Sequence, residues 1–129
     1  MHSIKPLKHL GQNFLTDTNI AKKIINLLGD IKDKKIYEIG PGTGILTELL
    51  INSGANLTCV EVDNRAVELL EQKFSSFSNF KIIHSDIRKI TLPEIICYAS
   101  TDTTSFANNK NFFSVIGNIP YNITNDIIF

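Results

Sequence analysis

Apolar residues recur along this chain at two different spacings, which predict strands and helices in turn. Four short apolar runs, several of them rich in β-branched residues, predict strands over residues 36–39, 57–62, 80–84 and 113–117. Because a strand of this length buries both faces only inside a sheet covered by other elements, the runs predict a central sheet.

Apolar positions three or four apart predict helices between these runs. One predicted helix ends at Ser53-Gly54 and a second covers residues 64–74. An earlier helix begins at Asp17 or Thr18, ends at Gly29, and is expected to carry on one face Ile20, Ile24, Leu27 and Leu28. Strands separated by helices indicate parallel crossovers, so we predict an α/β protein with a doubly wound parallel sheet.

Three segments lie outside this alternation. Residues 1–15 predict an irregular arm, residues 97–111 a polar and mobile surface loop, and residues 123–129 the start of a helix. The fourth strand would be left as an uncovered edge of the sheet. We therefore expect an N-terminal arm (1–15) and a partial domain (16–129) of a longer protein.

Composition is that of an ordinary globular domain, with 43% hydrophobic and 20% charged residues. No apolar run approaches the roughly 20 residues that span a bilayer. The N-terminus lacks the apolar core of a signal peptide, so we expect a cytoplasmic protein without a membrane partner. Cys59 and Cys97 have neither a disulfide pattern nor metal-ligand spacing, and no metal site is predicted.

The formal net charge is +0, but it is unevenly distributed. Residues 1–37 contain seven lysines and three aspartates, a net charge of +4. Such a region is compatible with a polyanionic partner, and equally with a solvated helix face.

A glycine-rich loop follows the first predicted strand. Gly40, Gly42 and Gly44 stand between strand and helix, where glycine lets the backbone approach a ligand closely. A dinucleotide fingerprint would need its third glycine at position 45, which is Ile45. The G-x-G-x-G spacing, preceded by Glu38, therefore disfavours NAD and suits S-adenosylmethionine (SAM), a nucleoside with a cationic sulfonium.

Acidic residues follow the next two strands. Glu61 lies 21 residues after Gly40, about where a carboxylate accepts the ribose hydroxyls of a nucleoside. Asp86 comes at the end of the third strand, and we expect it to accept from the adenine amino group. Each acid alone is typical of a solvated or capping residue, but the ordered set favours nucleoside binding.

The fourth strand runs directly into the tetrapeptide 118–121. Asn118 supplies an amide acceptor, Pro120 fixes the backbone so that the carbonyl of Ile119 points outward, and Tyr121 supplies a flat face for stacking. This combination suits holding an exocyclic amine on a planar ring. Alone, it is equally typical of a strand followed by a proline turn.

Together these segments resemble the rRNA adenine N6-dimethyltransferases of the KsgA type, class I SAM-dependent enzymes with a Rossmann-like fold. The matching stretches are residues 11–15 (GQNFL), 38–47 (EIGPGTGILT), 60–63 (VEVD), 84–86 (HSD) and 117–123 (GNIPYNI). They follow the family's order over most of the chain.

The resemblance implies a role for each matched residue. Asn13 and Leu15 would close over SAM from the arm, Gly40 and Gly42 would line the cofactor, and Asn118 would sit between cofactor and target base. It also implies that the remaining catalytic strands and a helical C-terminal domain follow Phe129. The family dimethylates two adjacent adenosines near the 3′ end of small-subunit rRNA during ribosome biogenesis, so we expect that rRNA as partner and a monomeric enzyme.

Several alternatives stay open on the sequence. Related antibiotic-resistance enzymes methylate an adenine of large-subunit rRNA, although Pro41 and Asn122 look more like the small-subunit enzymes. Other enzymes on this scaffold methylate DNA adenine, a protein glutamine or a small amine. A ribosome-assembly factor that binds RNA with little turnover is the non-enzymatic alternative.

Overall fold

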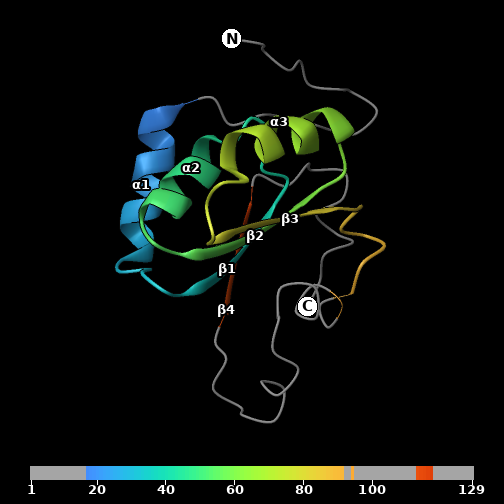
Figure 1. Cartoon of the computed structure of the whole chain (residues 1–129). Coiled ribbons are helices and arrows are strands. Elements are labelled where there is room, and N and C mark those ends of the chain that lie inside the picture. Colours follow the sequence, from blue (N-terminus) through green and yellow to red (C-terminus); the bar gives the residue numbers. More distant parts are fainter. Residues whose placement is uncertain (1–16, 92–93, 95–112, 118–129) are drawn as a thin grey trace.

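The computed structural model describes residues 17–91, 94 and 113–117. In chain order these form α1 (Thr18–Leu28), β1 (Lys35–Ile39), α2 (Ile45–Asn52), β2 (Asn56–Glu61), α3 (Asn64–Phe74), β3 (Phe80–His84) and β4 (Phe113–Gly117) (Figure 1). The predicted strands are confirmed to within one residue at each end. The arm, the polar loop and the C-terminal helix predicted from sequence lie outside the described residues.

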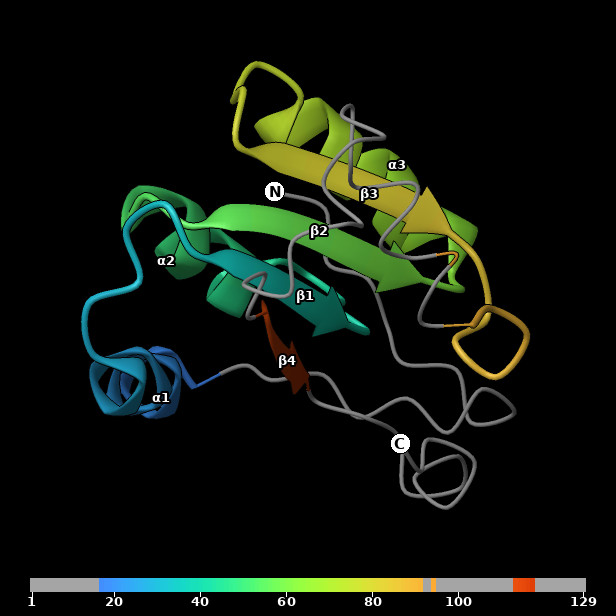
Figure 2. The ribbon, with the colours of Figure 1, turned by 90° about the horizontal axis from the view of Figure 1, so that it is seen from below.

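All strand pairs are parallel, and the strand order is β3-β2-β1-β4. The chain therefore moves outward from β1 to β2 and β3, then returns to the other side of β1 to form β4 (Figure 2). Because the strands are parallel, their carboxyl ends share one edge of the sheet. The reversal places a topological switch point between β1 and β4, where open α/β sheets bind ligands.

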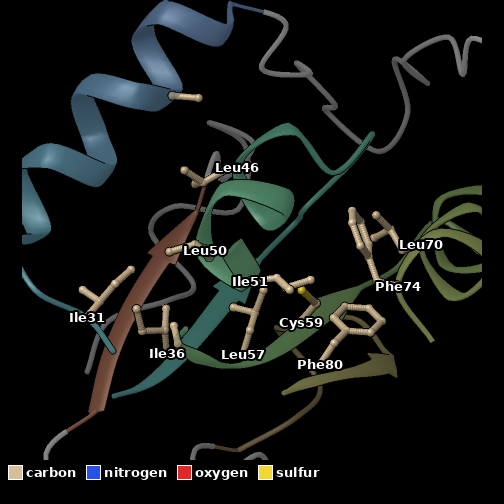
Figure 3. Close-up of a cluster of buried hydrophobic side chains, with 12 residues drawn as sticks. Ile31, Ile36, Leu46, Leu50, Ile51, Leu57, Cys59, Leu70, Phe74 and Phe80 are labelled. Carbon is tan, nitrogen blue, oxygen red and sulfur yellow. The ribbon is translucent and has the colours of Figure 1, made fainter. Parts of the chain in front are cut away.

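The three helices of the described residues cover one face of the sheet, and the main core lies between helices and strands (Figures 1 and 2). Its side chains come from both layers and meet in one cluster (Figure 3). Its labelled members are Ile31, Ile36, Leu46, Leu50, Ile51, Leu57, Cys59, Leu70, Phe74 and Phe80. Aliphatic strand residues at alternate positions supply one face of this cluster, as the period of two in a strand requires.

The intervening strand positions face the other side. Tyr37, Ile39 and Val60 are buried there and pack with Ile83 and with side chains from the segment that follows β3. Both faces of the central strands are therefore apolar, which explains why the sequence reads as near-continuous apolar runs.

Local signals fix the helix ends. The Asp17 side chain caps α1 by accepting from the backbone N–H groups of Asn19 and Ile20, at 2.8 and 3.3 Å. Gly29 ends the helix with φ +70°, a conformation that favours glycine. None of the described helices is long and apolar enough to cross a membrane.

The predicted buried face of α1 is wrong in part. Leu27 is 87% exposed and Ile20 is 47% exposed, whereas Ala21 is fully buried. The face that packs on the core is therefore turned toward Ala21, and of the predicted residues Ile24 and Leu28 are confirmed. A small residue at position 21 lets the helix approach its neighbours, which the spacing of large apolar side chains does not reveal.

Candidate cofactor site

The glycine loop makes a tight turn from β1 into α2. Gly40 extends the β ladder by donating to the Val60 carbonyl at 2.9 Å, and Gly44 donates to the Pro41 carbonyl at 3.0 Å. Gly40, Gly42 and Gly44 have φ angles of +67°, +58° and +88°. A side chain at any of these positions would strain the backbone, so the three glycines are required by the turn itself.

Gly44 has a second reason to be glycine. A Cβ atom there would lie 2.6 Å from Leu70 Cδ2 and 3.1 Å from a ring carbon of Phe74. Both neighbours belong to α3, so the absent side chain allows the start of α2 to pack against that helix. The third glycine of the motif therefore serves packing, while Gly40 and Gly42 remain the cofactor candidates.

Glu61 ties the end of β2 to the glycine loop. The residue is 3% exposed, and its Oε2 accepts the backbone N–H of Gly42 at 3.1 Å. Its Oε1 accepts the N–H groups of Val62 and Asp63, each at 3.0 Å. Burial raises the pKa of Glu61, against the opposing effect of these hydrogen bonds. Glu61, the residue predicted to bind the ribose, thus also holds the loop in place.

Glu38, on the strand that enters the loop, forms a second buried anchor. It is 2% exposed, and its Oε1 accepts a hydrogen bond of 2.6 Å from the Thr47 hydroxyl on α2. The Cys59 thiol of β2 contacts the same oxygen at 3.5 Å. Burial raises the pKa of Glu38 to about 7. Sequence reasoning used Glu38 only as the acid that precedes the glycine motif and assigned it no contact.

Asp86 lies beyond β3, on the same edge of the sheet. Its backbone neighbour Ser85 donates to the Glu61 carbonyl at 3.0 Å, which holds the two strand ends together. The carboxylate pairs with Arg88, whose Nη2 lies 2.6 Å from Oδ2 and whose Nε lies 3.0 Å from Oδ1. This pairing lowers the pKa of Asp86. In this conformation both carboxylate oxygens face a guanidinium.

The far end of the sheet carries part of the basic region. Lys35 begins β1 and pairs with Asn56, the first residue of β2, so it lies at the amino edge. Lys32 and Lys34 are exposed in the connection that leads there. These three lysines therefore lie at the edge opposite the glycine loop, while Lys5 and Lys8 lie outside the described residues.

Gly117 ends β4 beside the glycine loop. It pairs with Ile39, the residue directly before Gly40. A Cβ atom on Gly117 would lie 2.3 Å from the Ile39 carbonyl oxygen, so only glycine fits. The predicted catalytic residues Asn118, Ile119, Pro120 and Tyr121, and the predicted arm contacts Asn13 and Leu15, lie outside the described residues.

A parallel sheet of this order, with a glycine loop after β1 and an acid after β2, defines part of a Rossmann-like methyltransferase fold. The 23S rRNA methyltransferase ErmE has a similar structure, with a TM-score of 0.67 and 27% identity over 89% of this chain and 41% of that one. A dimethyladenosine transferase from Plasmodium falciparum is also similar, with a TM-score of 0.64 and 25% identity over 88% of this chain and 36% of that one.

The sequence comparison is more specific. Residues 4–129 match the family model described as ribosomal RNA adenine dimethylase, and the chain belongs to that family. Ribosomal RNA small subunit methyltransferase A of Sulfurihydrogenibium sp. is 39% identical over 99% of this chain and 46% of its own length. The protein of that name from Mycoplasma capricolum is 40% identical over 98% of this chain and 44% of its length. The chain spans less than half the length of these relatives.

Proposed function

We propose that this protein binds SAM at the carboxyl edge of its sheet and transfers the methyl group to N6 of adenine. We further propose that it dimethylates two adjacent adenosines in the 3′-terminal hairpin of small-subunit rRNA, on the immature ribosomal subunit. The supporting observation is the braced glycine loop at the switch point between β1 and β4. The small-subunit name of the relatives at 39% and 40% identity favours this rRNA over large-subunit rRNA.

The electrostatics of the loop fit a cationic donor. Two carboxyl groups lie close to the glycine loop: Glu38 comes two residues before Gly40, and Glu61 already accepts the Gly42 N–H. An N–H group used in this way is not available to a phosphate, and a nearby carboxylate repels one. The loop therefore suits a sulfonium and disfavours the pyrophosphate of a dinucleotide.

Glu61 has limited capacity for a nucleoside. A carboxylate has about four lone-pair sites, and three of them accept backbone N–H groups here. One ribose hydroxyl can be added at Oε2, whereas a second must replace a backbone bond. Asp86 can accept the adenine amino group once Arg88 moves aside. Gly40 and Gly42 would line the methionine part, with Asn13 and Leu15 closing from the arm.

Methyl transfer would depend on the residues that follow Gly117. When SAM is bound, its sulfonium supplies an electrophilic methyl group. The Asn118 side chain and the Ile119 carbonyl would accept hydrogen bonds from the adenine amine, which has two hydrogens before the first transfer and one before the second, and draw its nitrogen toward tetrahedral geometry, which frees the lone pair for attack. In each transfer the bond from nitrogen to the methyl carbon would form as the bond from that carbon to sulfur breaks, and the nitrogen would lose one proton to solvent. Pro120 would hold that carbonyl outward, and Tyr121 would receive the base that has left its stack.

Two measurements test this function in the full-length protein. Calorimetry should detect SAM binding and no NAD binding. Methylation assays should give two methyl groups per adenine on immature small subunits, and none on large-subunit rRNA or duplex DNA. Asn118→Ala should abolish transfer and leave SAM affinity within a few fold of wild type. Absence of SAM binding, or preference for another acceptor, would refute the proposal.

A further inference from the structure

The buried contact between Glu38 and Thr47 spans the glycine loop. Glu38 lies two residues before Gly40 at the end of β1, and Thr47 lies in the first turn of α2, three residues after Gly44. Their hydrogen bond of 2.6 Å joins the strand that enters the loop to the helix that leaves it. Both side chains are buried, so water cannot replace either partner without opening the core.

Local capping does not hold this end of α2. Gly44 is the N-cap residue, and it has no side chain to accept from the first turn. The loop contains three glycines in the left-handed region, which have many alternative conformations. Within the described residues, the Glu61 side chain forms a hydrogen bond with the loop, and the Glu38 side chain forms one with the first turn of α2.

We propose that Glu38 is a positioning residue that acts through Thr47 to hold the glycine loop in its ligand-binding geometry. Glu38 does not contact the ligand in this arrangement. Its carboxyl fixes the start of α2 relative to β1, and so fixes the separation of Gly40 and Gly44. This inference rests on the proposed SAM site and adds the residue that sets its shape.

The charge of Glu38 controls the strength of this contact. An ionised carboxylate accepts a shorter and stronger hydrogen bond from a hydroxyl than a neutral carboxyl does. Among the described residues, the titratable groups that face Glu38 are Cys59 and Glu61, both on β2, while α2 presents the uncharged Thr47. The Glu38 carboxyl titrates with a pKa near 7, so the loop should be held more firmly above neutral pH.

Threonine variants test the contact without adding or removing an ionisable group. Thr47→Val removes the hydroxyl at constant volume and should weaken SAM binding five- to tenfold in calorimetry. Thr47→Ser retains the hydroxyl and should bind within twofold of wild type. Thr58→Val is the matched control, because Thr58 is also buried but its side chain points to the other face of the sheet. The proposal is overturned if Thr47→Val binds within twofold of wild type, or if the control loses as much.

Hydrogen exchange separates this inference from the cofactor assignment. In the unliganded full-length protein, Thr47→Val should speed amide exchange at Gly42 and Gly44 at least tenfold, and Thr58→Val should not. If exchange is faster in Thr47→Val but the wild type binds no SAM, the positioning role is supported and the proposed function is refuted. Unchanged exchange would overturn the positioning role, whatever the ligand is.

A pH series supplies the readout that a purely structural role would not give. Wild-type affinity for SAM should fall three- to fivefold from pH 8 to pH 6, while resistance to unfolding changes in the opposite direction. Glu38→Gln should bind at pH 8 as weakly as wild type does at pH 6, with little further change. A wild-type pH slope in Glu38→Gln would contradict the role of Glu38.

Discussion

Replacing Glu61 should both destabilise the fold and weaken cofactor binding. Its carboxylate accepts three backbone N–H groups, from Gly42, Val62 and Asp63, at 3.0 to 3.1 Å. Glu61→Ala removes all three acceptors. Glu61→Gln retains one oxygen, which can still serve Val62 and Asp63, but turns an NH₂ group toward the N–H of Gly42. The glutamine variant therefore breaks chiefly the link between β2 and the loop.

The expected size follows from burial. Gly42 and Asp63 are buried, and a buried N–H group that loses its acceptor costs about 1–3 kcal/mol. Val62 is more exposed, so water can replace its acceptor. Part of this cost is offset, because burying the Glu61 carboxylate away from water itself destabilises the wild type, as the raised pKa of Glu61 indicates. Glu61→Ala should therefore lower the free energy of unfolding by about 2–4 kcal/mol, and Glu61→Gln by about half as much.

Urea unfolding followed by circular dichroism measures the stability, and calorimetry on the folded fraction measures SAM affinity. The control is Glu71→Gln, which makes the same change on the exposed surface of α3 and should stay within about 0.5 kcal/mol of wild type. If Glu61→Gln unfolds like the control, the brace to Gly42 is unimportant. If stability falls but SAM affinity does not, Glu61 is not in the ribose site.

Three other perturbations test separate parts of the site. The pKa of Glu38 is raised from 4.5 to about 7, so the stability that its neutral form contributes is complete below pH 4.5 and is lost as pH rises through 7. Urea unfolding should therefore show the free energy of unfolding falling by about 3 kcal/mol over this range in wild type, and no such fall in Glu38→Gln. Gly117→Ala should cost at least about 2 kcal/mol, because the added carbon meets backbone 2.3 Å away, whereas Gly29→Ala, with open space around it, should cost about 1 kcal/mol in the same assay. Arg88→Ala should tighten SAM binding about two- to fivefold by freeing its aspartate partner, whereas Arg65→Ala, which breaks a similar pair with Asp63, should not. If Arg88→Ala and wild type bind SAM with equal affinity in calorimetry, Arg88 does not compete with the cofactor for the aspartate.

Local sequence signals were enough to place most elements. Asp17 and Gly29 bound α1, and Asp63 caps α3 by accepting the N–H of Arg65 at 3.0 Å. Such signals depend on a few neighbouring residues, so they can be read without the fold. The strand at 113–117 was equally clear, because its apolar run follows a long polar segment.

Features that depend on tertiary packing were not predictable in this way. The helical period allows two overlapping stripes on α1, one through Ile20 and Leu27 and one through Ala21 and Leu28. Only packing selects the second, with Ala21 at the point of close approach. The Glu38–Thr47 hydrogen bond likewise joins residues nine positions apart that meet because the loop folds back. Sequence indicated the acids of the site but not their partners.

The three acids near the proposed cofactor site differ in how far they are available to a ligand. Glu38 is buried, and its carboxyl is bonded to the side chains of Thr47 and Cys59, so it serves the protein. Glu61 is also buried but keeps one lone pair beyond its three backbone bonds. Asp86 is held by an arginine whose side chain is 46% exposed and can swing away. Because the contacts that hold each acid become weaker from Glu38 to Asp86, the loop can be fixed before binding while the proposed adenine contact adjusts, which would limit the ordering cost of binding to the outer part of the site.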